Sequence, residues 1–332
     1  MSSVLTYESK IQRILDANWS KFNTLAERKG TIDIAEWAQY FAYDVVSELA
    51  LGRSFGMVKT GSDVGGYITS VVGSFYFTSN LGHVPGQRAW LTSSIAQLPI
   101  RWFGTDSLKG NANFRKFVND AVSDRYYAKT ASDSADMLQH FIEAKAEDGS
   151  RADFETVRGE AAIVLGAGAD TTSIGIRAVL AQILAHPDVY RRLQQEIDDF
   201  YALEIQDSEI SYKQCQTLPF LQAVIKEAGR LHPSIVYQLP RYAPHEGLAI
   251  DDYFIPPNQI VGISPIAMNR SKAIYGEDAN EFNPDRWLID DVKFRYMDSH
   301  LATVRPVTFS LKVVFDGTTH LHWEEHCASG NE

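Results

Sequence analysis

The sequence predicts a mainly α-helical protein with a small β region. From residue 7 to residue 231, apolar side chains recur at the three- and four-residue spacing of helices over most of the chain. After Pro233 the pattern changes to short alternating runs, broken by Pro-Pro and Asp-Asp pairs that are typical of turns. Strands and helices do not alternate along the chain, which argues against a parallel sheet built from β-α-β units.

The helices can be placed by their apolar faces and by the residues at their ends. The first is expected at 7–28, and the second, capped by Thr31 or Asp33, at 34–51. Asp153 is the expected N-cap of a long helix that ends near His186, because a proline follows. Further helices are expected at 112–128, 134–146, 189–202, 211–217 and 219–231, short helical pieces at 53–81, loops or short helices at 82–111 and 267–290, and two or three strands at 238–266.

Composition and charge exclude several classes of protein. The chain has 332 residues and a formal net charge of -11, which argues against nucleic acid as a partner because phosphate binding needs a basic surface. Its two cysteines, Cys215 and Cys327, provide neither a disulfide framework nor a clustered metal site. We find no run of about 18 apolar residues, so no transmembrane helix is predicted, and the first residues do not resemble a signal peptide.

The stretch from 157 to 185 holds polar residues inside an otherwise apolar helix. Asp170 and Thr171 follow Ala167-Gly168-Ala169, and burying a carboxylate and a hydroxyl is costly unless they have partners or a chemical role. Gly168 also weakens the helix by about 1 kcal/mol relative to alanine. On this stretch alone, a core helix with a satisfied carboxylate and a site where something packs against the backbone are equally good interpretations.

Four stretches carry a resemblance to one family. In chain order they are Ala-Gly-Ala-Asp-Thr-Thr at 167–172, Glu-Ala-Gly-Arg at 227–230 followed by Leu-His-Pro-Ser, the strand-like run at 238–261, and Phe-Asn-Pro-Asp-Arg-Trp at 282–287. A single Glu-x-x-Arg is weak evidence, because such pairs are common on helix surfaces. Together and in this order, the four resemble the cytochrome P-450 superfamily of heme-thiolate monooxygenases, most closely its fungal microsomal members. The resemblance implies a cytochrome P-450 fold that is incomplete here, with the chain truncated at both ends.

The resemblance assigns the distal heme site to the central helix. It implies that Ala167 and Gly168 let the cofactor approach the backbone, that Thr171 hydrogen-bonds the oxygen being activated, and that Asp170 relays protons through water. It also implies that Arg241 pairs with a heme propionate, the alternative being an exposed charge on a strand. No residue is assigned as a metal ligand.

The resemblance also implies a structural ion triad of Glu227, Arg230 and Arg286, which locks the loop leading to the heme. Glu227 and Arg230 lie one turn apart on the same face of a helix. If the triad is buried, truncating one member typically costs about 3–5 kcal/mol. The alternative is an exposed pair worth at most about 1 kcal/mol.

The sequence departs from the family after about Leu301. The cysteine that ligates the iron lies in Phe-x-x-Gly-x-Arg-x-Cys-x-Gly. Residues 302–332 lack this motif, and Cys327 has none of the flanking residues it would need. We therefore expect a partial cytochrome P-450 domain at 1–301 and an aberrant tail at 302–332. The first residues likewise resemble a segment already inside the fold, without the family's membrane anchor.

The missing cysteine motif could be encoded in another reading frame: if the codons of the tail are read one base later, the motif Phe-x-x-Gly-x-Arg-x-Cys-x-Gly is permitted. Trp323, followed by a codon that begins with G, forces a shifted glycine, and Leu321 encoded by CTG or TTG gives cysteine. Thr319, Gly317 and Val314 permit the arginine, the first glycine and the phenylalanine, so the shifted sequence is Phe-x-x-Gly-x-Arg-Thr-Cys-Ile-Gly. We interpret the tail as translated out of frame, through a retained intron, an indel or a gene-model error.

The expected function is heme-dependent monooxygenation, which inserts one oxygen atom from O2 into a small hydrophobic organic substrate in fungal secondary metabolism or xenobiotic oxidation. The resemblance implies electrons from NADPH through an NADPH-cytochrome reductase, and a location at the endoplasmic reticulum membrane. Without the anchor, this chain is expected in the cytoplasm. The alternative is a catalytically dead remnant that cannot bind heme because the ligand cysteine motif is absent.

Overall fold

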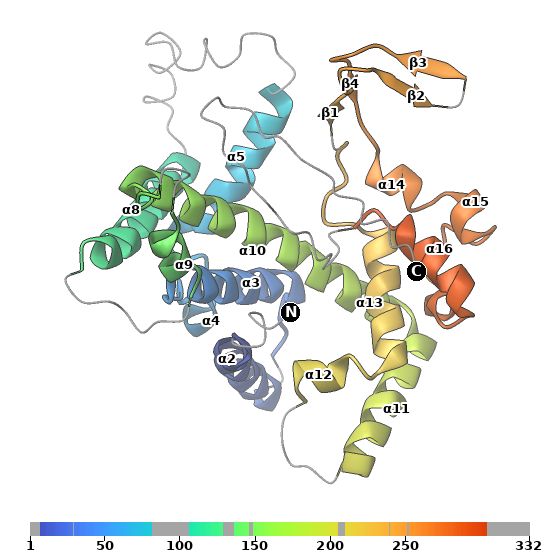
Figure 1. Ribbon diagram of the computed structural model, residues 1–332. Coiled ribbons are helices and arrows are strands. Elements are labelled where there is room, and N and C mark those ends of the chain that lie inside the picture. The colour runs from blue at the N-terminus through green and yellow to red at the C-terminus, as the bar shows by residue number, and fades with distance from the viewer. Residues whose placement is uncertain are drawn as a thin grey trace.

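The computed structural model shows a mainly α-helical protein with two small antiparallel sheets, which confirms the fold class expected from the sequence (Figure 1). The structure describes residues 7–28, 30–81, 106–128, 136–145, 149–204, 210–238, 240–250 and 252–303. From residue 304 onward, the tail that is expected to be out of frame, including Cys327, lies outside these residues.

The helices follow the order expected from the apolar pattern. Those of the first half are α2 (Glu8–Glu27), α3 (Ile34–Leu51), α4 (Met57–Thr60), the 3-10 helix η1 (Val64–Gly66), α5 (Tyr67–Leu81), α8 (Asp106–Tyr126) and α9 (Met137–Glu143). Those of the second half are α10 (Phe154–Ala185), α11 (Pro187–Glu204), α12 (Tyr212–Cys215), α13 (Pro219–Leu231), α14 (Pro265–Met268), α15 (Lys272–Tyr275), the 3-10 helix η2 (Pro284–Trp287) and α16 (Asp291–Ser299).

Helix ends form where the sequence places capping residues. The Asp33 side chain accepts a hydrogen bond from the backbone N–H of Ala35 at 2.9 Å, and the Asp153 side chain accepts one from Thr156 at 2.9 Å. Both satisfy N–H groups that have no partner within their own helix, so both expected N-caps are confirmed. Gly52 follows α3 with φ 66°, a left-handed conformation that glycine adopts without steric cost.

Two helices differ in extent from the expectation. Helix α8 begins at Asp106 and includes Gly110, where any side chain would collide with the backbone of Gly66. This glycine therefore permits close packing inside the helix and does not mark a helix end. Helix α9 is shorter than 134–146, because the buried side chain of Asp136 caps it by accepting a hydrogen bond from the N–H of Gln139 at 3.0 Å.

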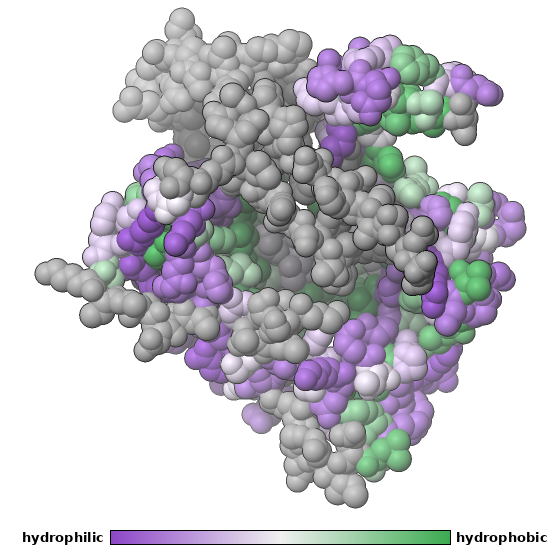
Figure 2. All heavy atoms as spheres, in the orientation of Figure 1, coloured by the Kyte–Doolittle hydropathy of each residue, from purple (hydrophilic) through white to green (hydrophobic). Residues whose placement is uncertain are grey.

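The described β region contains four strands, where alternation predicted two or three. Strand β1 (Arg241–Tyr242) pairs with β4 (Ile260–Val261), and β2 (Leu248–Ile250) pairs with β3 (Tyr253–Ile255), both antiparallel. Runs of two or three residues are too short for alternation to separate them. The β2–β3 hairpin projects away from the helices, with apolar and polar side chains mixed on its surface (Figures 1 and 2).

Helix α10 runs through the middle of the molecule (Figure 1). It lies along α3 and also contacts α8, α9, α11 and α13. One side of α10 supplies Val157, Ala161, Leu165 and Ala169 to the main core, where none is more than 1% exposed. The core thus fixes which side of α10 faces inward.

By length and composition alone, helix α10 could also cross a membrane. The sequence did not predict this, because the apolar residues of α10 are interrupted by polar ones. A central helix of a folded domain passes the same test. Because α3, α8 and α13 pack against it, we describe α10 as the central helix of this domain.

A buried carboxylate anchors the turn between α3 and α4. Asp44 is 2% exposed and accepts hydrogen bonds from the backbone N–H groups of Gly56 at 2.8 Å, Met57 at 3.1 Å and Val58 at 2.9 Å. The first N–H groups of a helix have no partner within it. Asp44 therefore ties the start of α4 to the middle of α3, directly beneath the core that supports α10.

We predict that Asp44→Ala lowers the free energy of unfolding by at least about 3 kcal/mol, because each buried N–H left without a partner costs roughly 1–3 kcal/mol. Asp44→Asn should cost less, since it keeps one oxygen acceptor. Urea unfolding followed by circular dichroism measures both changes. Equal midpoints for the wild type and Asp44→Ala would show that the carboxylate does not anchor this turn.

Candidate functional site

Helix α10 holds the side chain of Thr171 in one orientation. Its Oγ1 donates a hydrogen bond to the carbonyl oxygen of Ala167 at 2.9 Å and lies 3.4 Å from that of Gly168. This bond to the preceding turn is a common arrangement for threonine in a helix. From the segment after α13, Ser234 donates its hydroxyl to the carbonyl oxygen of Thr171 at 2.8 Å. The hydroxyl and the peptide of Thr171 are therefore both fixed.

The neighbouring Asp170 is a half-buried carboxylate. In the described part of the chain, its side chain makes no hydrogen bond or ion pair. Burial raises the pKa of Asp170 above its ordinary value of 3.8, and the positive charge of Arg177 on the same helix opposes this. A carboxyl group with a raised pKa, adjacent in the chain to a residue with a fixed hydroxyl, is suited to accept and release protons.

A strip of α10 beside Thr171 is open and apolar. Ile163 is 63% exposed, Ala167 is also exposed, and a side chain at Gly166 would meet no atom within 4 Å. Positions 163, 167 and 171 are each four residues apart and so share one face of the helix. A flat, largely apolar cofactor such as heme fits against this strip, with the Thr171 hydroxyl at its edge.

Gly168 faces the other way. A Cβ at this position would lie 3.4 Å from Cγ1 of Val46, which belongs to α3. Gly168 therefore lies on the side of α10 that packs against α3, where a Cβ would still be at about contact distance. The approach of the cofactor at this glycine, which the resemblance implies, stays a prediction. Of the two residues expected to contact heme from the helix, it is Ala167 that lies on the open strip.

The described residues do not include an axial thiolate for this strip. Cys215, the cysteine within the described ranges, lies on α12. Burial, and to a smaller extent the negative charge of Glu8, raises the pKa of its thiol, which disfavours the thiolate. Within the described ranges, no group of three or more His, Cys, Asp or Glu side chains could hold a metal ion. An axial ligand for a heme lying on this strip is therefore not among the described residues.

Arg241 is placed apart from the Asp170–Thr171 pair. It begins strand β1, its side chain is exposed, and its guanidinium donates a hydrogen bond to the carbonyl oxygen of Pro240 at 2.8 Å. It belongs to the small β region above the helices, not to the wall of α10 (Figure 1). Its expected pairing with a propionate stays a prediction.

His232 sits at the C-terminal end of α13, in a pocket of about 560 Å³. Its Nε2 lies 2.8 Å from Nε2 of Gln182 on α10, and burial together with the charge of Arg270 lowers its pKa. These contacts join α13 to the end of α10, in agreement with a structural role for this histidine.

Glu227 is the centre of a fully buried ion network. Both of its carboxylate oxygens accept hydrogen bonds from Arg230, at 2.7 and 2.8 Å, in the bidentate arrangement that arginine favours. The Nε of Arg286 donates to the same carboxylate at 3.3 Å. The structure therefore brings together the three residues that the sequence placed in the triad.

Other groups complete the shell around the Glu227 carboxylate. The indole N–H of Trp287 donates to it at 2.9 Å, and the backbone N–H of Asn283 donates to it at 3.1 Å. The carboxylate thus accepts five hydrogen bonds, which compensates a charge that would be very costly to bury alone.

Arg230 has partners for all five of its N–H donors. Besides the two bonds to Glu227, its guanidinium donates to the carbonyl oxygens of Asn269 at 2.7 Å, Ala279 at 2.6 Å and Glu281 at 3.1 Å. Arg230 can be 0% exposed because each of the five N–H groups of its guanidinium has a hydrogen-bond acceptor within the protein. The side chain thereby holds the loops between α14 and η2 onto α13.

Two further members of the network were not foreseen from the sequence. Asp278 forms an ion pair with Arg286 at 2.9 Å, and hydrogen bonds from Arg286 and then Asn283 lower its pKa. The buried Asn269 exchanges two hydrogen bonds with the backbone of Ala302, at 2.8 and 3.2 Å, and so clamps the last described segment. Both lie in a stretch expected as loop and short helix, where no periodic signal marks a buried side chain.

Comparison with known proteins identifies what this arrangement resembles. The family model described as cytochrome P450 matches residues 1–302. A cytochrome P450 monooxygenase of Aspergillus terreus is 33% identical over 91% of this chain and 62% of its own length. A pisatin demethylase of Fusarium vanettenii is 30% identical over 87% of this chain and 55% of its own length, and a quiannulatic acid synthase of Emericella variicolor is 32% identical over 84% and 56%. The chain thus spans roughly 60% or less of the length of these curated relatives.

Solved structures share the fold. A crystal structure of a cytochrome P450, CYP102L1, superposes with a TM-score of 0.70 at 22% identity, over 88% of this chain and 60% of that one. The heme domain of cytochrome P450DA superposes with a TM-score of 0.69 at 20% identity, over 89% and 60%. At this identity the match concerns the fold alone, which is present here in part.

We predict that Glu227→Gln lowers the free energy of unfolding by about 3–5 kcal/mol, because it leaves the buried charges of two arginines without their shared counter-ion. Glu277→Gln, which removes an exposed partner of Lys272 at 2.7 Å, should change stability little. Chemical unfolding of both variants measures the difference. Similar midpoints for the two would mean that the network does not stabilise the fold.

We predict that Asp170→Asn stabilises the protein at neutral pH. Because the folded pKa of Asp170 is raised, the folded state binds its proton more tightly than the unfolded state, so the group's contribution to stability is lost as pH rises from 3.8 through the folded pKa. Melting temperatures measured between pH 3 and pH 8 should therefore show a gain for Asp170→Asn that disappears at the acid end.

Asp153 provides the matched contrast for Asp170. Hydrogen bonds from the backbone and side chain of Thr156 lower the pKa of Asp153, so Asp153→Asn should destabilise the protein at neutral pH and lose that effect in acid. A uniform, pH-independent effect of Asp170→Asn would contradict the assignment of a raised pKa to that carboxyl group.

Proposed function

This chain belongs to the cytochrome P450 family, and we propose on that premise that it is a heme-dependent monooxygenase, which inserts one oxygen atom from O2 into a small hydrophobic organic substrate. One observation carries the proposal: a half-buried carboxylate, Asp170, stands next to the fixed hydroxyl of Thr171 at the edge of the open strip on α10. A positioned acid and alcohol are what proton delivery to a reacting oxygen requires.

In this proposal, each residue of the strip has a defined task. Ala167 provides a small side chain against which the cofactor lies, and Gly168 leaves the backbone beside it without a side chain. The Thr171 hydroxyl, which donates its proton to the carbonyl oxygen of Ala167, accepts hydrogen bonds at the strip's edge, while Asp170 exchanges protons with water. Arg241 would hold a propionate. The heme, when bound, supplies the oxygen chemistry itself.

The partners and substrate class are proposed from the family. Electrons are to come from NADPH through a reductase, at the endoplasmic reticulum membrane. Two relatives, a pisatin demethylase and a quiannulatic acid synthase, have names that point to small organic substrates. A fungal secondary metabolite is the substrate class that agrees best with these names.

A second candidate function is a remnant that does not bind heme. The observation in its favour is the printed sequence itself, which contains no Phe-x-x-Gly-x-Arg-x-Cys-x-Gly motif. A thiolate ligand is required for the oxygen chemistry of this family. As written, residues 302–332 do not provide that ligand in its expected surroundings.

We propose that the shifted reading frame reconciles the two candidates. The family match ends at residue 302, and the tail that follows, read one base later, permits a cysteine at the position of Leu321 with the flanking residues of the motif. The domain would then comprise residues 1–301 and a continuation in the shifted frame. Reading the coding DNA is the first test, because a codon 321 other than CTG or TTG excludes the idea.

The spectroscopic test compares the chain as written with a chain whose frame is shifted by one base from about residue 302. We predict that carbon monoxide added after reduction gives the Soret band of thiolate ligation only in the shifted chain. The control carries serine in place of the restored cysteine and should lose the band. A thiolate band from the chain as written would overturn the remnant, and its absence from a folded, heme-loaded shifted chain would overturn the enzyme.

A further inference from the structure

Tyr43 is a buried tyrosine whose hydroxyl group has no hydrogen-bond partner among the described residues. It lies on α3 and is 1% exposed, and its Oη atom is buried. Buried polar groups nearly always have a partner in a folded protein. The proposed proton delivery by Asp170 and Thr171 does not involve this hydroxyl, so the lack of a partner needs another physical reason.

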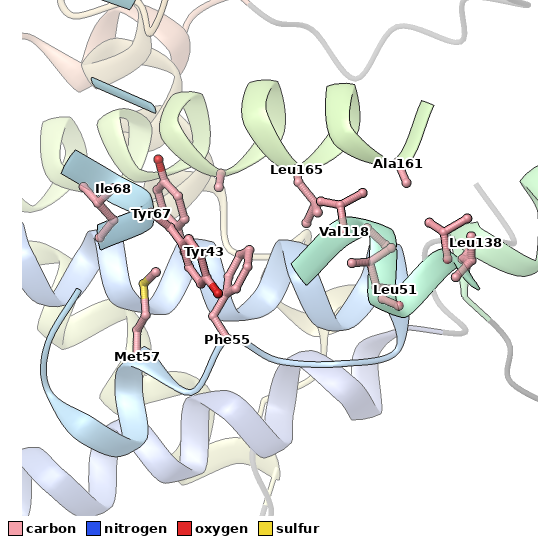
Figure 3. Close-up of a cluster of buried hydrophobic side chains, with 14 of the residues drawn as sticks. Tyr43, Leu51, Phe55, Met57, Tyr67, Ile68, Val118, Leu138, Ala161 and Leu165 are labelled. Atoms are coloured by element: carbon pink, nitrogen blue, oxygen red, sulfur yellow. The ribbon is translucent and has the colours of Figure 1, made fainter. Parts of the chain in front are cut away.

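The packing of α3 against α10 places Tyr43 near Asp170. Figure 3 shows Leu51 of α3 near the Ala161 end of α10, with Tyr43 further along α10 in the direction of its C-terminus, so the two helices are antiparallel. Val46 of α3 and Gly168 of α10 lie opposite each other, since a Cβ at Gly168 would be 3.4 Å from Cγ1 of Val46. Tyr43 lies almost one turn before Val46 on α3, and it therefore faces the part of α10 that follows Gly168, where Asp170 is found.

Electrostatics agree with this placement. Burial raises the pKa of Tyr43, and among charged groups Asp170 raises it most, followed by Asp63. The group that faces Asp170 from its own helix is Arg177. The carboxylate of Asp170 makes no hydrogen bond within the described residues, so a buried donor without a partner stands near a half-buried acceptor without one.

We propose that Tyr43 is a positioning residue for Asp170, donating a hydrogen bond through one bridging water molecule to the Asp170 carboxylate and holding it on the α3 side of α10. A water molecule can join two polar groups that are too far apart for a direct bond, and buried waters typically satisfy such groups. The contact stands on the packing of α3 and α10; only its use in proton delivery rests on the proposed function.

The test uses the full chain without heme and follows the carboxyl carbon of Asp170 by ¹³C NMR as a function of pH, with Asp170→Asn to assign the signal. Tyr43→Phe removes the donor that favours the ionised carboxylate. We expect the proton-binding constant of Asp170 to rise about three- to tenfold, because a hydrogen bond to a charged group is lost.

Tyr40→Phe is the matched control. Tyr40 lies on the same helix one turn earlier and is 9% exposed, but the charged groups that act on it are Glu36, Asp63 and Asp33. We therefore expect Tyr40→Phe, which removes this hydroxyl, to leave the proton-binding constant of Asp170 unchanged. Identical titration curves for the wild type and Tyr43→Phe would overturn the proposal, as would equal shifts in both tyrosine variants.

A reciprocal measurement covers the case in which Tyr43→Phe does not fold. In Asp170→Asn, the ¹³Cζ signal of Tyr43, which reports hydrogen bonding of the phenol, should move while that of Tyr40 stays in place. An unchanged Tyr43 signal would overturn the contact. Neither measurement depends on heme, so failure here is distinguishable from failure of the monooxygenase proposal, which the carbon monoxide spectrum tests.

Discussion

The buried carboxylate of Glu227 is the constraint on which the C-terminal half of the structure depends. Two carboxylates, the buried Glu227 and the partly exposed Asp278, face two guanidinium groups, Arg230 and Arg286, so the charges of the network balance. Removing one partner of a buried ion pair strongly destabilises a protein, because the remaining charge has neither a counter-ion nor water around it. The loops between α14 and η2 must therefore fold back onto α13, since they supply the carbonyl oxygens and the N–H groups that complete the network.

Short segments connect the same network to the open strip of α10. Helix α13 ends just before Ser234, whose hydroxyl binds the carbonyl oxygen of Thr171. In the other direction, the carbonyl of Asn269 binds Arg230, and its side chain clamps the backbone of Ala302. A change in the ion network would thus alter the positions of two groups: the peptide of Thr171 on α10 and the backbone of Ala302 in the last described segment.

Helix α10 has two faces with different physical roles. One packs into the core, where Ala169 is fully buried and Gly168 lies opposite Val46 of α3. The other is open, apolar and ends at Thr171. Asp170 lies between them, half-buried, which is why its pKa is raised while it still has access to water. A carboxyl group at such a boundary can exchange protons with solvent and still respond to buried neighbours.

The sequence by itself determined the fold class, the order of the helices and the N-caps Asp33 and Asp153, because periodicity and capping chemistry are local or nearly local signals. The membership of the triad was implied by the resemblance of its motifs to those of the cytochrome P450 family. The sequence could not decide that Gly110 permits helix packing, that Gly168 faces α3, or that Asn269 and Asp278 are part of the ion network. Only the tertiary structure decided these points, and it also left the buried Tyr43 hydroxyl without a hydrogen-bond partner among the described residues. The physical reason is that burial and side-chain direction depend on which distant segment packs opposite, and that information is not contained in any one stretch of the chain.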